Sequence, residues 1–189
     1  NGFRGDELSA IGTRHFNGRL ASETKKRIDS FGAVGIDEFL RLARMGHLQD
    51  EVLDAKDSAA VPALVRALND KDARVRSASV AGLGTISDER AIEPLLAVIG
   101  HDPDSGIRAR AVVALSRIGA TAPPKVIATL VRALKSDSDE FVREAAATAL
   151  GKRHAEESAG ALVAALTDVS YNVRKAVADA LWRREDNGR

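Results

Sequence analysis

The chain is short of the residues on which several kinds of protein chemistry depend. Its 189 residues include no cysteine, one methionine, one tryptophan and one tyrosine, and aromatic residues make up 4% of the total. The missing cysteine excludes disulfide bonds, thiolate nucleophiles and cysteine-ligated metal sites. So few aromatic rings argue against stacked bases or an enclosed flat cofactor. Lys and Arg number 28 against 27 Asp and Glu, so the chain as a whole carries no electrostatic signal for nucleic acid.

Signals for membranes, targeting, metals and catalysis are also missing. No long apolar run or charged leader pattern appears, so we expect a cytoplasmic protein without a membrane partner. The sequence contains neither a phosphate-binding glycine loop nor a Gly-x-Ser-x-Gly elbow. The four histidines form no metal-binding pair, because they are far apart: His15, His47, His101 and His154. We therefore expect no cofactor and favour a protein that is not an enzyme.

What the chain does contain is one motif written four times. Each copy runs from an aspartate through a Val-Arg or Ile-Arg pair to a leucine, as in DKDARVRSASVAGLG at 70–84. The motif arginines follow one another at intervals of 32, 35 and 31 residues: Arg76, Arg108, Arg143 and Arg174. An aspartate stands six residues before each of them: Asp70, Asp102, Asp137 and Asp168. Such spacing suits one helical hairpin per repeat.

A second apolar segment with helical periodicity lies upstream of each aspartate, for example AVPALVRAL from residue 60. No useful stretch alternates with the period of two that marks a strand. The predicted fold class is therefore all-α, an α-solenoid of helical hairpins. We place four repeats within 59–189, at about 59–87, 88–119, 120–155 and 156–186. The preceding residues, 1–58, are interpreted as an N-terminal helical segment and a degenerate capping repeat.

The repeated arginine has a structural interpretation. Four residues before it stands a short polar side chain that can cap the second helix of the pair: Asp72, Asp104, Asp139 and Ser170. An arginine one turn into that helix can bridge the turn aspartates of its own and a neighbouring repeat, since its planar fork suits carboxylates and carbonyls. We expect the arginines and turn aspartates to form a ladder that fixes the register between repeats.

This pattern resembles the HEAT repeat family, and most closely the short HEAT-like repeats of the phycobilisome-lyase type. The resemblance covers residues 59 to 184 and rests on the turn aspartate, the Val-Arg pair and the Ala-x-x-x-Leu-Gly ending. It implies a right-handed superhelix whose second helices line an inner surface. It also implies an alternative function, that of a bilin lyase or a lyase-like factor that handles a tetrapyrrole.

Basic residues recur on the second helices of repeats two to four and form the first candidate site. A groove lined by them would bind an acidic or phosphorylated segment of another protein. An ordinary solvated helix end has the same composition, because cations there relieve the helix dipole. The basic set is Arg110, Arg117, Lys152, Arg153, Lys175, Arg183 and Arg184.

Two aromatic residues in the last repeat form the second candidate site. Tyr171 and Trp182 are eleven residues apart, about three helical turns, so they can share one face. Trp182 stands in the column that holds Gly84, Ser116 and Gly151 in the earlier repeats. Exposed rings of this kind anchor interfaces, and a large ring can equally cover the open end of a last repeat. Both interpretations stay open at this point.

The function that these observations favour is a non-catalytic protein-binding scaffold or adaptor. Its inner surface, built from the second helices, would make spaced contacts with another protein. The bilin lyase is the alternative, and it depends on the family resemblance alone. Nucleic-acid binding through the basic residues is a third hypothesis, which the net charge of +1 disfavours.

Overall fold

A computed structural model describes residues 41, 44, 58–118, 123–153 and 156–186 of the chain. All regular structure in these ranges is helical, which confirms the predicted all-α solenoid. The expected cap at 1–58 lies outside the described residues, except for Arg41, Arg44 and Ser58. Its extent, the repeat boundaries and the handedness of the superhelix stay predictions. No helix in the described ranges combines the length and the apolar character needed to cross a membrane.

The helices form four consecutive pairs. Their first members are α3 (Val61–Ala67), α5 (Ile92–His101), α7 (Pro124–Ser136) and α9 (Glu156–Ala165). Their second members are α4 (Ala73–Ile86), α6 (Ser105–Arg117), α8 (Glu140–Arg153) and α10 (Tyr171–Asp186). Two short 3-10 helices, η2 (Ser58–Ala60) and η3 (Glu89–Ala91), lead into α3 and α5.

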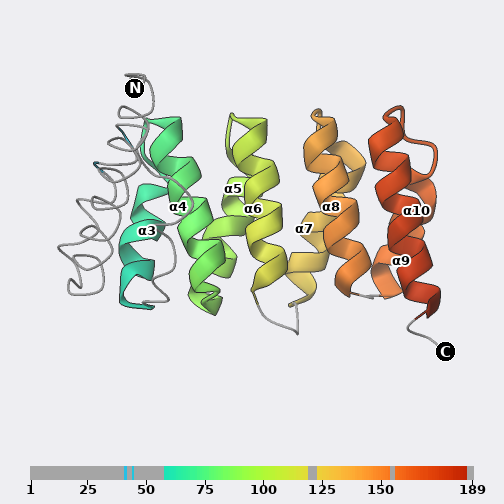
Figure 1. The fold of residues 1–189 in the computed structure, drawn as a ribbon, viewed down its shortest axis with the longest axis horizontal. Coiled ribbons are helices and arrows are strands. Elements are labelled where there is room, and N and C mark those ends of the chain that lie inside the picture. The colour runs from blue at the N-terminus through green and yellow to red at the C-terminus, as the bar shows by residue number, and fades with distance from the viewer. Residues whose placement is uncertain (1–40, 42–43, 45–57, 119–122, 154–155, 187–189) are drawn as a thin grey trace, which may run out of the picture.

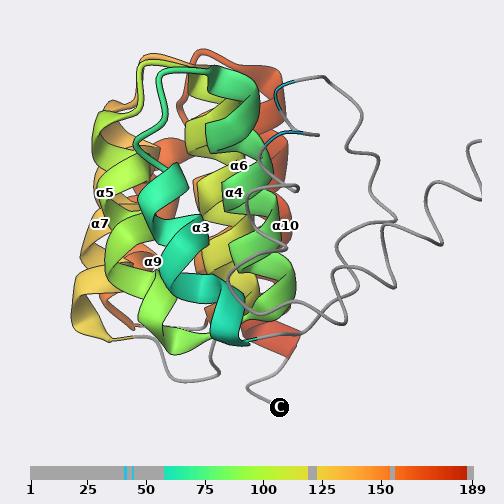
Figure 2. The same ribbon diagram turned by 90° about the vertical axis from the view of Figure 1, so that its left-hand side faces the viewer.

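The pairs stack into two layers. The second helices lie side by side in chain order, with α4 against α6, α6 against α8 and α8 against α10 (Figure 1). The first helices make the other layer, in which α5 contacts α7 and α7 contacts α9 (Figure 2). Because each second helix repeats the same register, residues at equivalent motif positions form rows across α4, α6, α8 and α10.

Each second helix begins at the polar residue that the motif predicts. The side chain of Asp72 accepts a hydrogen bond from the Arg74 amide at 2.9 Å, and Asp104 and Asp139 cap α6 and α8 in the same way. In the last pair the Ser170 hydroxyl accepts from the Val173 amide at 3.5 Å. These bonds satisfy amides that have no partner inside the helix, and they confirm the predicted caps.

The core lies between the two layers and is built from the apolar motif positions. The leucine seven residues after each arginine is completely buried in the first three repeats, as Leu83, Leu115 and Leu150. Its equivalent in α10, Leu181, is only partly buried, because no further helix of the described chain packs beside it. The residue before each arginine is buried in all four repeats. Both motif positions therefore contribute side chains to the same core.

Two glycines let neighbouring second helices approach closely. A Cβ atom placed on Gly84 would lie 2.8 Å from the Cβ of Ala114 on α6. On Gly151 it would lie 2.5 Å from the Cβ and 2.7 Å from the Cα of Ala180 on α10. Neither neighbour is a flexible side chain that can turn away. Glycine is therefore required at these two positions for the close approach of α4 to α6 and of α8 to α10, whereas α6 carries Ser116 at the equivalent position.

We expect Gly151→Ala to lower the free energy of unfolding by about 1–3 kcal/mol, because the added methyl group forces α8 and α10 apart. Gly160→Ala is the matched control: a Cβ there meets nothing within 4 Å, and the substitution should stabilise α9 by about 0.5–1 kcal/mol. Urea denaturation measures both variants. A Gly151→Ala protein as stable as wild type would contradict the close packing.

Candidate binding surface

The surface formed by the second helices is held in register by a ladder of arginine–aspartate pairs. Arg76 donates from Nε and Nη2 to the two carboxylate oxygens of Asp102, at 2.8 and 3.1 Å. Arg108 makes the same two bonds to Asp137 at 2.9 and 2.7 Å, and Arg143 makes them to Asp168 at 2.8 and 3.0 Å. Each arginine thus joins its own helix to the turn of the next repeat.

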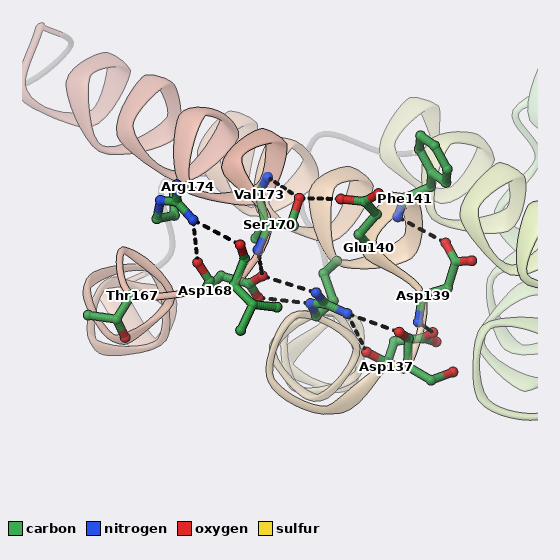
Figure 3. A network of polar contacts seen from close by, with 12 residues as sticks. Asp137, Asp139, Glu140, Phe141, Thr167, Asp168, Ser170, Val173 and Arg174 are labelled. Carbon is green, nitrogen blue, oxygen red and sulfur yellow. Dashed lines mark hydrogen bonds and ion pairs between the residues drawn. The ribbon is translucent and has the colours of Figure 1, made fainter.

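Contact with the arginine's own turn aspartate is made through the backbone. The Nη1 of Arg76 donates to the backbone carbonyl of Asp70 at 3.1 Å. Equivalent bonds run from Arg108, Arg143 and Arg174 to the carbonyls of Asp102, Asp137 and Asp168. One carboxylate oxygen of Asp70 instead accepts a hydrogen bond from the Asp72 amide, within the same turn. Figure 3 shows this network around Asp137 and Asp168.

One pair of the ladder was missed from the sequence. Arg44 donates from Nη2 to Asp70 at 2.6 Å, and it lies 26 residues before that aspartate, the same separation as between Arg76 and Asp102. Alanine stands before Arg44 where the motif has valine or isoleucine, so the copy escaped recognition. The interval of 32 residues from Arg44 to Arg76 was the available signal.

The three inner pairs are largely shielded from water. Arginine side chains there are 11–13% exposed and the aspartates 4–11%, whereas Arg44 is 52% exposed. The Arg143 hydrogen bond holds the pKa of Asp168 below its ordinary value. Burial alone would raise the pKa of Asp137, but bonds from Arg108 and from the Asp139 amide keep it lowered. Both carboxylates are therefore stabilised in their charged form.

Three exposed cations share one register on neighbouring helices. They stand ten residues after the buried Val or Ile of the motif, in α6, α8 and α10, and we call them the basic row: Arg117, Lys152 and Arg183. The equivalent residue of α4 is the half-buried Thr85. Arg110 and Lys175 are also exposed, but they occupy other positions on α6 and α10. The structure thus aligns three of the seven basic candidates.

Two other basic candidates do not extend this row. Arg153 donates to the carbonyl of Leu115 at 2.6 Å and to that of Ile118 at 3.3 Å, so it caps the end of α6. Partial burial lowers the pKa of its guanidinium. We therefore leave Arg153 out of the proposed surface and assign it to packing between repeats. The side chain of Arg184 lies outside what the structure describes.

A shallow polar hollow lies between α8 and α10, next to the basic row. Arg183 belongs to both, so the hollow continues the row toward the start of the helices. Acidic and basic groups line it together: Glu144, Asp179, Lys175 and Arg183, with Thr148 and Asn172 between them. The hollow therefore presents positively charged, negatively charged and neutral polar side chains close together.

The aromatic candidates lie on α10. Tyr171 is 68% and Trp182 71% exposed, and both the interface and the capping interpretation stay predictions. The guanidinium of Arg174 lies 5.9 Å from the centroid of the Tyr171 ring. Among the described residues, no cluster of His, Asp and Glu side chains could hold a metal ion.

A family model for HEAT repeats matches residues 46–116 and 116–182. The chain belongs to the HEAT repeat family. This result confirms the broader resemblance, while the phycobilisome-lyase type stays a hypothesis. A comparison with curated proteins gives no match.

Solved structures add support for the fold. An engineered protein is similar over 87% of this chain and 78% of its own, with 23% identity and a TM-score of 0.53. A designed armadillo repeat protein, solved in complex with the peptide (KR)4, matches over 95% of both chains with 17% identity and a TM-score of 0.56. At these identities the likeness concerns the fold alone.

The ladder between the HEAT repeats predicts how stability depends on pH. A carboxylate with a lowered folded-state pKa contributes stability that is complete above its unfolded pKa of about 3.9 and is lost as the pH falls through the folded value. We expect Asp168→Asn to lower the free energy of unfolding by about 1–2 kcal/mol at pH 7, and this deficit should shrink below about pH 4.

Urea titrations of both proteins between about pH 7 and about pH 2 measure the deficit. Ser138→Ala, at an exposed position of the α7–α8 turn, is the control and should track wild type at every pH. A deficit that stays constant over the whole range would show that the charge of Asp168 contributes nothing.

Proposed function

We propose that this chain is a non-catalytic adaptor that binds an acidic or phosphorylated segment of another protein across its second helices. The observation that carries the proposal is the basic row, in which Arg117, Lys152 and Arg183 repeat at one register on three adjacent helices. In contrast to the ladder arginines, these side chains are exposed. The bound segment would run across α6, α8 and α10.

The spacing of the row suits an extended peptide. Packed helices lie about 8–10 Å apart, so neighbouring cations of the row repeat at about that interval. A peptide in the polyproline II conformation advances about 3.1 Å per residue with three residues per turn, so every third side chain recurs on the same side at about 9 Å. A segment with Glu, Asp or a phosphorylated residue at every third position would meet one cation per helix.

The hollow favours a peptide over a uniform polyanion. Glu144 and Asp179 contribute negative charge beside the basic row, and they would repel the phosphates of a nucleic acid. A peptide can instead present amides or a basic residue to these carboxylates and its acidic residues to the row. This arrangement supports a protein partner and weighs against nucleic acid.

Repeat proteins of similar fold give general support. The designed armadillo repeat protein is in complex with the peptide (KR)4, which is basic. The row of the present chain is itself basic, so charge complementarity calls for a peptide of the opposite sign.

The absence of cysteine fits a reducing compartment, and we propose a cytoplasmic location on that ground.

The test is fluorescence anisotropy with a labelled peptide that carries glutamate at every third position, and with a second peptide that carries phosphoserine there. We expect reversal of Arg117, Lys152 and Arg183 to Glu to weaken binding at least about a hundredfold, since three attractive contacts become repulsive. Circular dichroism checks that the variant stays folded.

The matched control reverses Arg66, Arg132 and Lys135 to Glu, which changes the net charge equally on the exposed side of α3 and α7. Equal loss of binding in both variants would mean that only net charge matters, and it would refute the proposed surface. Two further titrations test the other hypotheses. Tighter binding of a short DNA duplex would favour nucleic acid, and a shifted absorbance band of added bilin would favour the phycobilisome-lyase type.

A further inference from the structure

The side of α10 that faces away from α8 has a composition unlike that of the earlier second helices. On α4, α6 and α8 the equivalent positions face the following helix and are buried or half-buried. On α10 all four are exposed, and they recur at intervals of four, three and four residues: Tyr171, Lys175, Ala178 and Trp182. Lys175 lies at the edge of this side, since it also lines the hollow between α8 and α10. Such spacing makes a continuous stripe along one side of a helix. We call it the terminal stripe.

Three apolar residues of α9 and its turn are exposed as well: Val163, Leu166 and Val169. The positions equivalent to Leu166 in the second and third repeats are also exposed, but they hold Gly100 and Lys135. The last pair therefore exposes more large apolar side chains than the earlier pairs, as interfaces do.

Trp182 opposes a helix packed as closely as those beside the glycines of the earlier repeats. It occupies the position of Gly84, Ser116 and Gly151, and at the two glycines even a methyl group would lie within 3 Å of the next helix. An indole ring there would keep a further second helix away from that close approach. A helix that packs on the terminal stripe would therefore have to cross α10 in a different arrangement.

The terminal stripe is complementary to itself. Arg174 and Trp182 each lie four residues from Ala178, on opposite sides of it. A two-fold axis through Ala178 would place Ala178 against its own copy, where the small side chain allows close contact. The same axis would set Arg174 of each copy against Trp182 of the other.

The guanidinium of Arg174 is held in place for such a contact by hydrogen bonds to the backbone. Its Nη1 is fixed by the carbonyls of Asp168 and Val169 at 2.7 and 3.0 Å, as in the other ladder arginines. In the other ladder arginines, Nε and Nη2 bond the aspartate of the next repeat. In the described part of the chain, no carboxylate bonds this edge of the Arg174 guanidinium. A guanidinium presented in this way can stack on an indole face.

We propose that two copies of the chain associate through antiparallel α10 helices, with Ala178 at the crossing and Trp182 of each copy over Arg174 of the other. The second-helix face and its basic row stay free on both copies. An interface built mainly from one helix per copy is small, so we expect a dissociation constant between about 1 µM and about 1 mM.

Analytical ultracentrifugation over that concentration range, together with the fluorescence of Trp182, tests the proposal on the full chain. Trp182 is the sole tryptophan, so its emission reports this surface alone. We expect a concentration-dependent dimer whose formation shifts the emission to shorter wavelength. Ala178→Glu should weaken the dimer at least about tenfold, because it places two carboxylates at the crossing. Trp182→Ala should weaken it similarly.

Ala128→Glu, at an exposed position of α7, is the matched control and should dimerise like wild type. Thermal unfolding of each variant confirms that the monomer is intact, as expected for substitutions at exposed positions. A chain that stays monomeric up to about 1 mM would overturn the proposal. So would a dimer that persists in Ala178→Glu, or an emission maximum that does not change on association.

Discussion

The structure depends on one contact, the two-pronged bond from an arginine to the turn aspartate of the following repeat. It brings together a charge fixed on one second helix and a carboxylate already oriented by the amide two residues later. Bonds of this type are directional as well as strong, so they fix angle and register as well as distance. An apolar interface alone would tolerate sliding between helices, since hydrophobic contact has little directionality. The ladder makes the repeats equivalent.

Because the repeats are equivalent, residues far apart in the sequence come together as continuous surfaces. Because Arg108 and Arg143 hold successive helices in one register, the cations of the basic row stand side by side instead of being staggered. The same register places Gly151 against Ala180 and so demands a residue without a side chain at that position. On α10, beside which no further helix of the described residues packs, the equivalent position is filled by Trp182. The binding surface and the terminal stripe are thus two consequences of one constraint.

Much of this fold could be predicted because its signals are local and repeated. The caps, the ladder partners and the buried leucines follow from spacing within one motif, and four copies remove chance from the pattern. The pair from Arg44 escaped because its neighbouring alanine breaks the motif. The role of Arg153 escaped because its partner Leu115 lies 38 residues earlier, on the neighbouring helix α6. Long-range contacts of that kind produce no periodic pattern in the sequence. Exposure of Tyr171 and Trp182 likewise depends on what packs beside α10.

The arginine–aspartate pairs couple one repeat to the next. A double-mutant cycle on Arg108→Ala and Asp137→Ala measures that coupling directly, because the two residues belong to different repeats. We predict that each single variant loses stability and that the double variant loses about 1–3 kcal/mol less than the sum of the two. Losses that simply add would mean that the pair contributes no energy of its own. The ladder would then be a consequence of the packing and not its cause.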